Sequence, residues 1–190
     1  MTFRQRILRG MFAPAIARAR RFGSDDRGVT AIEFGVLAIP FFVMVYAIME
    51  TAMLFFASQV LDSAVEDASR RVRTGQAQAA SWNLTNFRTE LCGYTFNLFG
   101  DCSGIQIKVA VIANFAAAAT APAVQTCTSS TCTWDPDFQS YNGGTRRDVV
   151  QVQAFYRWPL QVILPYFNLR NQPDNYRLIS AMRVFRNEPF

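Results

Sequence analysis

The chain contains no histidine among its 190 residues, although histidine is the commonest general base and a frequent metal ligand. It also lacks a glycine-rich phosphate loop, a serine nucleophile elbow and a cluster of metal-ligating side chains. These absences leave no recognisable active site. The sequence therefore predicts a protein that is not an enzyme and that needs no cofactor, metal ion or small-molecule substrate.

Net positive charge is missing from most of the chain. The first 28 residues hold seven arginines against two aspartates, a net +5 that equals the net charge of the whole protein. Nucleic-acid binding needs basic side chains on a folded face, and the neutral remainder of the chain excludes it. Basic residues ahead of an apolar segment predict a cytoplasmic N-terminus. A mitochondrial presequence is disfavoured because serine is scarce and a full span follows at once.

Charge is also nearly absent from residues 34–57, where Glu50 is the only charged residue among 24. As a helix this segment would extend ~36 Å, enough to cross a ~30 Å hydrocarbon core with some tilt. Pro40 cannot donate a helical hydrogen bond and is expected to bend the helix. Together with Glu33 and Glu50 it is a candidate contact in assembly. Glu50 would lie in the outer third of the bilayer, where it either reaches toward the outer interface or contacts another subunit.

Beyond residue 57 the pattern becomes amphipathic. Apolar residues at steps of three and four predict that the helix continues to about residue 74, with Gly75 as its C-terminal cap. Glu66–Arg70 and Asp67–Arg71 pairs are expected along its polar face. The apolar stripe consists of Val60, Leu61, Ala64, Val65, Ala68 and Val72.

Residues 76–190 are predicted to form a small α+β domain outside the membrane. A helix over 82–91 capped by Ser81, and strands over 105–112, 149–158 and 179–186, follow from apolar periodicity and turn residues. Residues 113–133 are expected to form a loop, and residues 160–167 a short helix or turn. A mixed, mainly antiparallel sheet packed on the apolar stripe of the long helix is the simplest arrangement.

No cysteine lies before the apolar span, and all four lie after it, at Cys92, Cys102, Cys127 and Cys132. In an oxidising compartment this predicts two disulfides rather than free thiols. Three pairings are possible, and short loop closure favours 92–102 with 127–132. A four-cysteine zinc site is the alternative, although no Cys-x-x-Cys spacing supports it.

The segment from Arg27 to Phe34 reads Arg-Gly-Val-Thr-Ala-Ile-Glu-Phe. It resembles the cleavage region of type IV prepilins and pseudopilins, and with the following Gly-Val-Leu-Ala-Ile-Pro it resembles the TadE-like family of the tight-adherence (Tad/Flp) pilus machinery. The ending, Val184 to Phe190, is also similar to that family. The resemblance implies cleavage by a prepilin peptidase between Gly28 and Val29, with Glu33 as the fifth residue of the mature chain. Because the first residue would be Val rather than Phe, N-methylation stays open.

Glu33 has a physical role in such a chain. Cleavage would create an α-amine on Val29 with a pKa of about 7.7–8.0, one helical turn before the Glu33 carboxylate. The two charges could neutralise each other or pair between neighbouring subunits, which lowers the cost of burying both. The alternative is a first-turn glutamate favoured by the helix dipole at the cytoplasmic interface.

Together these patterns predict three parts: a basic leader over 1–28, a transmembrane helix with its extension over 29–75, and an exoplasmic α+β domain over 76–190. The expected function is that of a minor pilin-like protein of the bacterial inner membrane, with a cytoplasmic N-terminus and a periplasmic domain. Its expected partners are the membrane, a prepilin peptidase, and other pilin or pseudopilin subunits of the pilus machinery. The alternative is an uncleaved single-pass scaffolding or binding protein.

Overall fold

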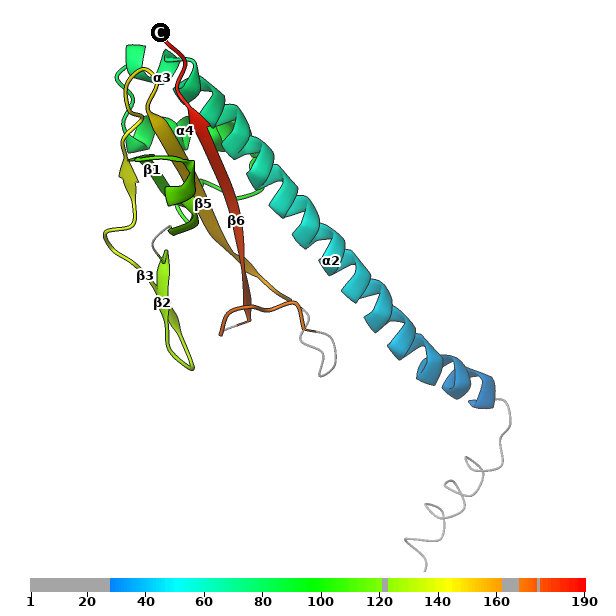
Figure 1. Ribbon diagram of the computed structural model, residues 1–190. Coiled ribbons are helices and arrows are strands. Elements are labelled where there is room, and N and C mark those ends of the chain that lie inside the picture. Colours follow the sequence, from blue (N-terminus) through cyan, green and yellow to red (C-terminus); the bar gives the residue numbers. More distant parts are fainter. Residues whose placement is uncertain (1–27, 121–122, 162–167, 174) are drawn as a thin grey trace, which may run out of the picture. The chain divides into compact units, whose positions relative to one another are not determined.

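The computed structural model describes residues 28–120, 123–161, 168–173 and 175–190 (Figure 1). Apart from Gly28, the predicted basic leader therefore lies outside the described residues, as does most of the helix or turn predicted over 160–167. By packing, the chain divides into two compact units, 1–47 and 48–190. The second unit contains the sheet domain together with the later part of the long helix.

Helix α2 runs continuously from Val29 to Arg73 and confirms the single long helix predicted over 29–74. It ends where Gly75 adopts a left-handed conformation (φ 82°), which a residue without a Cβ reaches without strain. Arginines in the last turn complement the negative end of the helix dipole. The helix continues through Pro40, and the predicted bend there stays a prediction.

Two short helices follow, α3 (Gln76–Ala79) and α4 (Leu84–Gly93). The predicted capping residue of the second helix, Ser81, is wrong by two positions. Asn83 caps α4 instead, because its side chain accepts from the Asn86 amide while the Asn86 side chain accepts from the Asn83 amide. Asparagine is as good a cap as serine, and this reciprocal pair satisfies two amides that the helix leaves unbonded.

A four-stranded sheet forms the centre of the second unit, in the order β4-β1-β5-β6. The strands are β1 (Gln106–Ile112), β4 (Ser140–Tyr141), β5 (Val149–Pro159) and β6 (Tyr176–Arg186). Strand β5 pairs antiparallel with both β1 and β6, whereas β4 pairs parallel with β1. The predicted strands are confirmed, although β6 begins three residues earlier than expected.

The segment predicted as a loop over 113–133 is more ordered than expected. It contains a 3-10 helix, η2 (Phe115–Thr120), and most of a two-stranded hairpin formed by β2 (Gln125–Cys127) and β3 (Cys132–Trp134). Cys127 and Cys132 lie opposite each other in this hairpin. The short strands were missed because three-residue strands carry almost no periodic signal.

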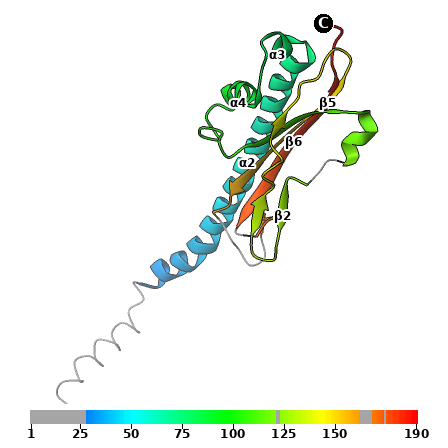
Figure 2. The ribbon, with the colours of Figure 1, turned by 90° about the vertical axis from the view of Figure 1, so that its left-hand side faces the viewer.

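The apolar stripe of α2 packs on one face of the sheet, as Figure 2 shows for the part of α2 that runs behind β5 and β6. Alternate strand residues point to opposite faces, so one set from each strand meets the helix. The other face is covered by η2 and the β2–β3 hairpin, since Gln151 bonds Ala118 O and Arg157 bonds Cys132 O. The fully buried side chains include Leu61, Ala64, Val65, Ala68 and Val72 from α2, and Ile107, Val109, Val150, Val152 and Ala154 from the sheet. This confirms the α+β fold and the amphipathic extension.

The C-terminal tail closes the far end of α2. The Glu188 amide donates to Arg73 O at 2.9 Å, and Asn187 Nδ2 donates to the carbonyl of Gly143 at 2.9 Å. A Cβ built on Gly75 would lie 2.4 Å from the Phe190 ring. Gly75 is therefore required twice, once by its positive φ and once by the close approach of the tail.

Candidate processing and assembly segment

The peptide bond predicted to be cut lies at the very start of α2. Gly28 is the first described residue and Val29 is the first residue of the helix. Both are exposed, and a Cβ placed on Gly28 would meet no atom of the described residues within 4 Å. Packing against the described residues thus does not require glycine at this position, which leaves recognition by another protein as a reason for it.

Glu33 is exposed on α2, one helical turn after Val29. The first turn of the helix contains no acidic residue, so Glu33 lies beyond the region where the dipole of a helix N-terminus acts most strongly. This weakens the interpretation of Glu33 as a first-turn acid. Its spacing from Val29 is the one that allows a side chain to meet the charge at the first helical position.

The surface around Glu33 is apolar on all sides. Phe34 is 71% exposed and Leu37 is 70% exposed, and the exposed large apolar residues continue along α2 as far as Phe56. A helix that is hydrophobic all round must be covered by lipid or by other helices. Helix α2 is long and apolar enough to cross a membrane. This indicates that the chain is anchored in a membrane by α2.

Glu50 has a role that the sequence did not indicate. It is only 9% exposed, and its Oε1 accepts a hydrogen bond from the backbone amide of Gln161, just after β5. Its neighbours Met49 and Phe55 on the same helix are exposed. The carboxylate therefore faces the chain's own sheet domain and links α2 to the end of β5. No local pattern could reveal this contact, because the two residues lie 111 positions apart.

We expect Glu50→Ala to lower the free energy of unfolding by about 1–3 kcal/mol, because it leaves the Gln161 amide without its acceptor. Glu50→Gln keeps an oxygen in place and should cost less. Thermal unfolding of the full chain in nanodiscs measures both, with Glu33→Gln as a control at an exposed position on the same helix. Equal stability of the Ala variant and the unchanged protein would contradict this role. A change in crosslinking between subunits without loss of stability would favour the subunit contact.

The extension of α2 is tied to β6 by charge. Arg183 lies 2.6 Å from Asp62 and 3.1 Å from Glu66, two carboxylates one turn apart on α2. Its hydrogen bonds to Asp62, followed by those to Glu66, raise the pKa of Arg183. These groups are partly exposed, so the cluster fixes geometry more than it adds stability.

The two ion pairs predicted along α2 are wrong. Glu66 binds Arg183 rather than Arg70, and Arg71 binds Glu90 of α4 at 2.5 Å rather than Asp67. A hydrogen bond with Tyr94 and the nearby Glu90 charge raise the pKa of Arg71. The physical reason is tertiary: β6 and α4 bring partners that the local helical spacing cannot anticipate.

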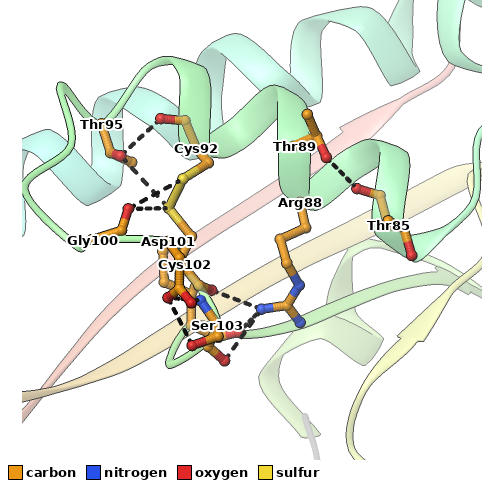
Figure 3. The surroundings of a disulfide bond; sticks show 10 residues. Thr85, Arg88, Thr89, Cys92, Thr95, Gly100, Asp101, Cys102 and Ser103 are labelled. Carbon is orange, nitrogen blue, oxygen red and sulfur yellow. Dashed lines mark hydrogen bonds between the residues drawn. A yellow bond between two sulfur atoms is a disulfide. The ribbon is translucent and has the colours of Figure 1, made fainter.

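The four cysteines form two disulfides, Cys92–Cys102 and Cys127–Cys132, which confirms the preferred pairing. They are therefore not available as zinc ligands. Figure 3 shows Arg88 of α4 pointing toward the loop at Cys102 and Ser103, beside the first bridge. Arg88 donates to Cys102 O and Ile105 O at 2.8 Å each. Burial lowers the pKa of Arg88. The bridge and the guanidinium together hold the loop between α4 and β1.

Comparison with known proteins bears on α2. Residues 28–70 match the TadE-like protein family. This confirms the resemblance inferred from the cleavage-like motif, and the TadE-like match begins at Gly28 itself. It associates the chain with the Tad pilus system, with a membrane and with pilus partners; the TadE-like family is a family of pilus components. No curated protein and no solved structure matches the chain significantly.

The TadE-like match ends within α2 and leaves the sheet domain outside it. The similarity noted for the ending, Val184 to Phe190, is not covered by the match and stays a prediction. The matched region contains the segment predicted for processing and all three candidate assembly residues, Glu33, Pro40 and Glu50.

Proposed function

We propose that this protein is a minor pilin-like subunit, a pseudopilin, that takes part in assembling a Tad-type pilus. The observation that carries the proposal is the start of α2. The helix begins at the residue after Gly28, its first part over residues 29–46 is apolar and largely exposed, and it carries its only early acid at the fifth position. The match to the TadE-like family over residues 28–70 supports it.

Membrane insertion follows from the charge distribution. The net +5 charge of residues 1–28 retains the N-terminus on the cytoplasmic side of a bacterial inner membrane. Helix α2 then crosses the bilayer, and the sheet domain folds in the periplasm, where its two disulfides are stable.

Cleavage after Gly28 by a prepilin peptidase removes the arginine-rich leader and creates a charged amine at Val29. Glu33 lies one turn away on the same helix and neutralises this amine, either within the chain or in a neighbouring subunit. Without the leader, the exposed apolar surface of α2 is free to pack against helices of other pilin subunits. The work of the protein is thus packing rather than chemistry.

Intact-mass analysis of the protein from native membranes tests this proposal. We expect a chain that starts at Val29 instead of Met1, and full length restored by substitutions at Gly28 or Glu33. A leader that is still attached to the protein in piliated cells would contradict the proposal.

An uncleaved membrane-anchored scaffolding protein is the second candidate. The compact unit over 48–190, which contains both disulfides, favours it because the proposed cleavage site lies outside that unit. In that case the mass would correspond to a start at Met1 or close to it.

A further inference from the structure

The outer edge of β6 is an open sheet edge. Strand β6 is last in the order β4-β1-β5-β6 and is eleven residues long. In an antiparallel pair, alternate residues direct both N–H and C=O toward the partner strand, and the residues between them direct both groups outward. Unpaired outward groups make such an edge a template for another strand.

Two contacts show which residues of β6 point outward. Leu178 N donates to Asn171 Oδ1 at 2.7 Å, and Asn171 Nδ2 donates to Leu178 O at 3.3 Å, so Leu178 faces away from β5. The Asn187 amide donates to Asp148 O and so continues the hydrogen-bond ladder between β6 and β5. The backbone groups of the odd-numbered residues of β6 therefore point toward β5. The outward residues are therefore the even-numbered ones.

The edge of β6 is occupied near its start, at Leu178, and has unpaired amides farther along the strand. The Asn171 side chain occupies the edge at Leu178 as a strand would, and Met182 O accepts from Arg183. Across the described part of the chain, the outward amides of Ser180, Met182 and Val184 have no acceptor. The amides of three successive outward positions are thus free to donate to a partner strand, although the Met182 carbonyl is already bonded to Arg183.

A groove of ≈ 370 Å³ runs beside this open edge, between α2 and β6. Its wall contains Ser69, which is 4% exposed and whose Oγ has no hydrogen-bond partner among the described residues. Arg183 is already neutralised by Asp62 and Glu66. The lining residues are Glu66, Asp67, Ser69, Arg70, Arg73, Arg183, Val184 and Phe185.

Two charges in the groove are left for a partner. Arg73 pairs loosely with Glu188 at 3.7 Å, but Asp67 and Arg70 form no ion pair within the described ranges. They are separated by three residues on α2, about 4.5 Å along its axis. Side chains on one face of a strand repeat every ~6.8 Å, so a strand with an acid and a base two positions apart can meet both.

A second copy of this chain does not fit the edge. Helix α2 and β6 run in the same direction, since Asp62 lies beside Arg183 and Arg73 lies beside Glu188, farther along both elements. Antiparallel pairing of two β6 strands would therefore point the two α2 helices in opposite directions, which one membrane with one orientation forbids. Parallel pairing about a twofold axis would place each β6 residue opposite its own copy, so that residues with outward backbone groups would lie opposite each other. In a parallel ladder, a residue whose backbone groups point to the partner strand must instead lie opposite a residue whose groups point away.

We propose that the edge of β6 from Ser180 to Val184 binds an extended strand of a different protein, one that carries an acidic side chain toward Arg70 and a basic one toward Asp67. The added strand continues the sheet beyond β6, and its side chains enter the groove along α2, where a polar group reaches Ser69. This inference rests on the membrane insertion of α2 and is independent of cleavage after Gly28.

Photocrosslinking of the full chain in native membranes tests the inference, with the probe p-benzoylphenylalanine at Ser180, which is exposed. We expect a crosslink that mass spectrometry maps to an extended segment of another protein. Val184→Pro removes an outward amide and leaves the ladder to β5 intact, so its crosslink yield should fall about tenfold. Val184→Ala keeps that amide and serves as the matched control.

Arg70→Glu is a second variant that does not depend on the tolerance of β6 for proline, because Arg70 is exposed on α2. It should also reduce the crosslink, whereas Arg70→Lys should retain most of it. A crosslink to another copy of this chain, or equal yields for the Pro and Ala variants at matched stability, overturns the inference. The same crosslink in the uncleaved Gly28→Ala protein separates this result from the fate of the proposed function.

Discussion

Replacing Gly28 with Ala is expected to leave the chain uncut, so that the protein keeps its full mass of 21.4 kDa in native membranes. The added methyl group would meet no atom within 4 Å among residues 28–190 that the structure describes, so the described fold has no reason to respond. Any loss of cleavage therefore reports on recognition by the peptidase. Intact-mass spectrometry of the membrane fraction measures it directly.

Gly35 provides a matched control for this substitution. It lies on the same helix, and a Cβ on Gly35 also meets nothing within 4 Å. Gly35→Ala makes the same chemical change seven residues away and should leave cleavage intact. A Gly28→Ala chain that still starts at Val29, or an unchanged protein that still carries its leader, would contradict the proposed processing.

Removing the Cys92–Cys102 disulfide with a double substitution to alanine is expected to lower the free energy of unfolding by ~3 kcal/mol, from the entropy of the loop it closes. The ten-residue separation is twice that of the other bridge, and Cys102 is fully buried against the core. The loop between α4 and β1 would then be held only by the hydrogen bonds that Arg88 donates to it, without the disulfide (Figure 3). Chemical denaturation of the oxidised proteins measures the difference.

The Cys127–Cys132 bridge is the internal comparison. It closes a five-residue separation within a hairpin that stands outside the four-stranded sheet. The hairpin keeps other attachments, because Arg157 donates to Cys132 O and stacks 4.1 Å from the Trp134 ring. Its removal should cost less than removal of the first bridge. A larger loss from the 127–132 variant would show that the hairpin, not the α4–β1 loop, limits stability.

The features that were predicted correctly are encoded in neighbouring residues. Helix α2 follows from a long apolar segment, from the amphipathic pattern that continues it, and from Gly75, which ends it. The buried stripe follows from steps of three and four residues, and strand β5 follows from a segment rich in valine and aromatic residues that ends at Pro159. The disulfide pairing follows from loop length, because the nearest cysteines in sequence are also the nearest in space.

The features that were missed depend on residues far apart in the chain. Glu50 meets the Gln161 amide, and Arg183 meets Asp62 across a separation of 121 residues. Their partners were assigned to lipid, to another subunit or to the next helical turn, since only these are visible locally. The parallel pairing of β4 with β1 is of the same kind, because a two-residue strand has no signal apart from its partner.

The sequence alone therefore determined the long apolar helix, the net positive charge of the residues before it, the glycine at their junction and the four cysteines that come after the apolar segment. Hydrophobic periodicity, charge and spacing are local properties, so they can be read from the sequence without a structure. Only the tertiary structure decided that Glu50 faces its own domain and that the edge of β6 stays open beside Arg70. Those outcomes depend on which residues far apart in the chain the folded sheet brings into contact. The local sequence around either residue does not specify that contact.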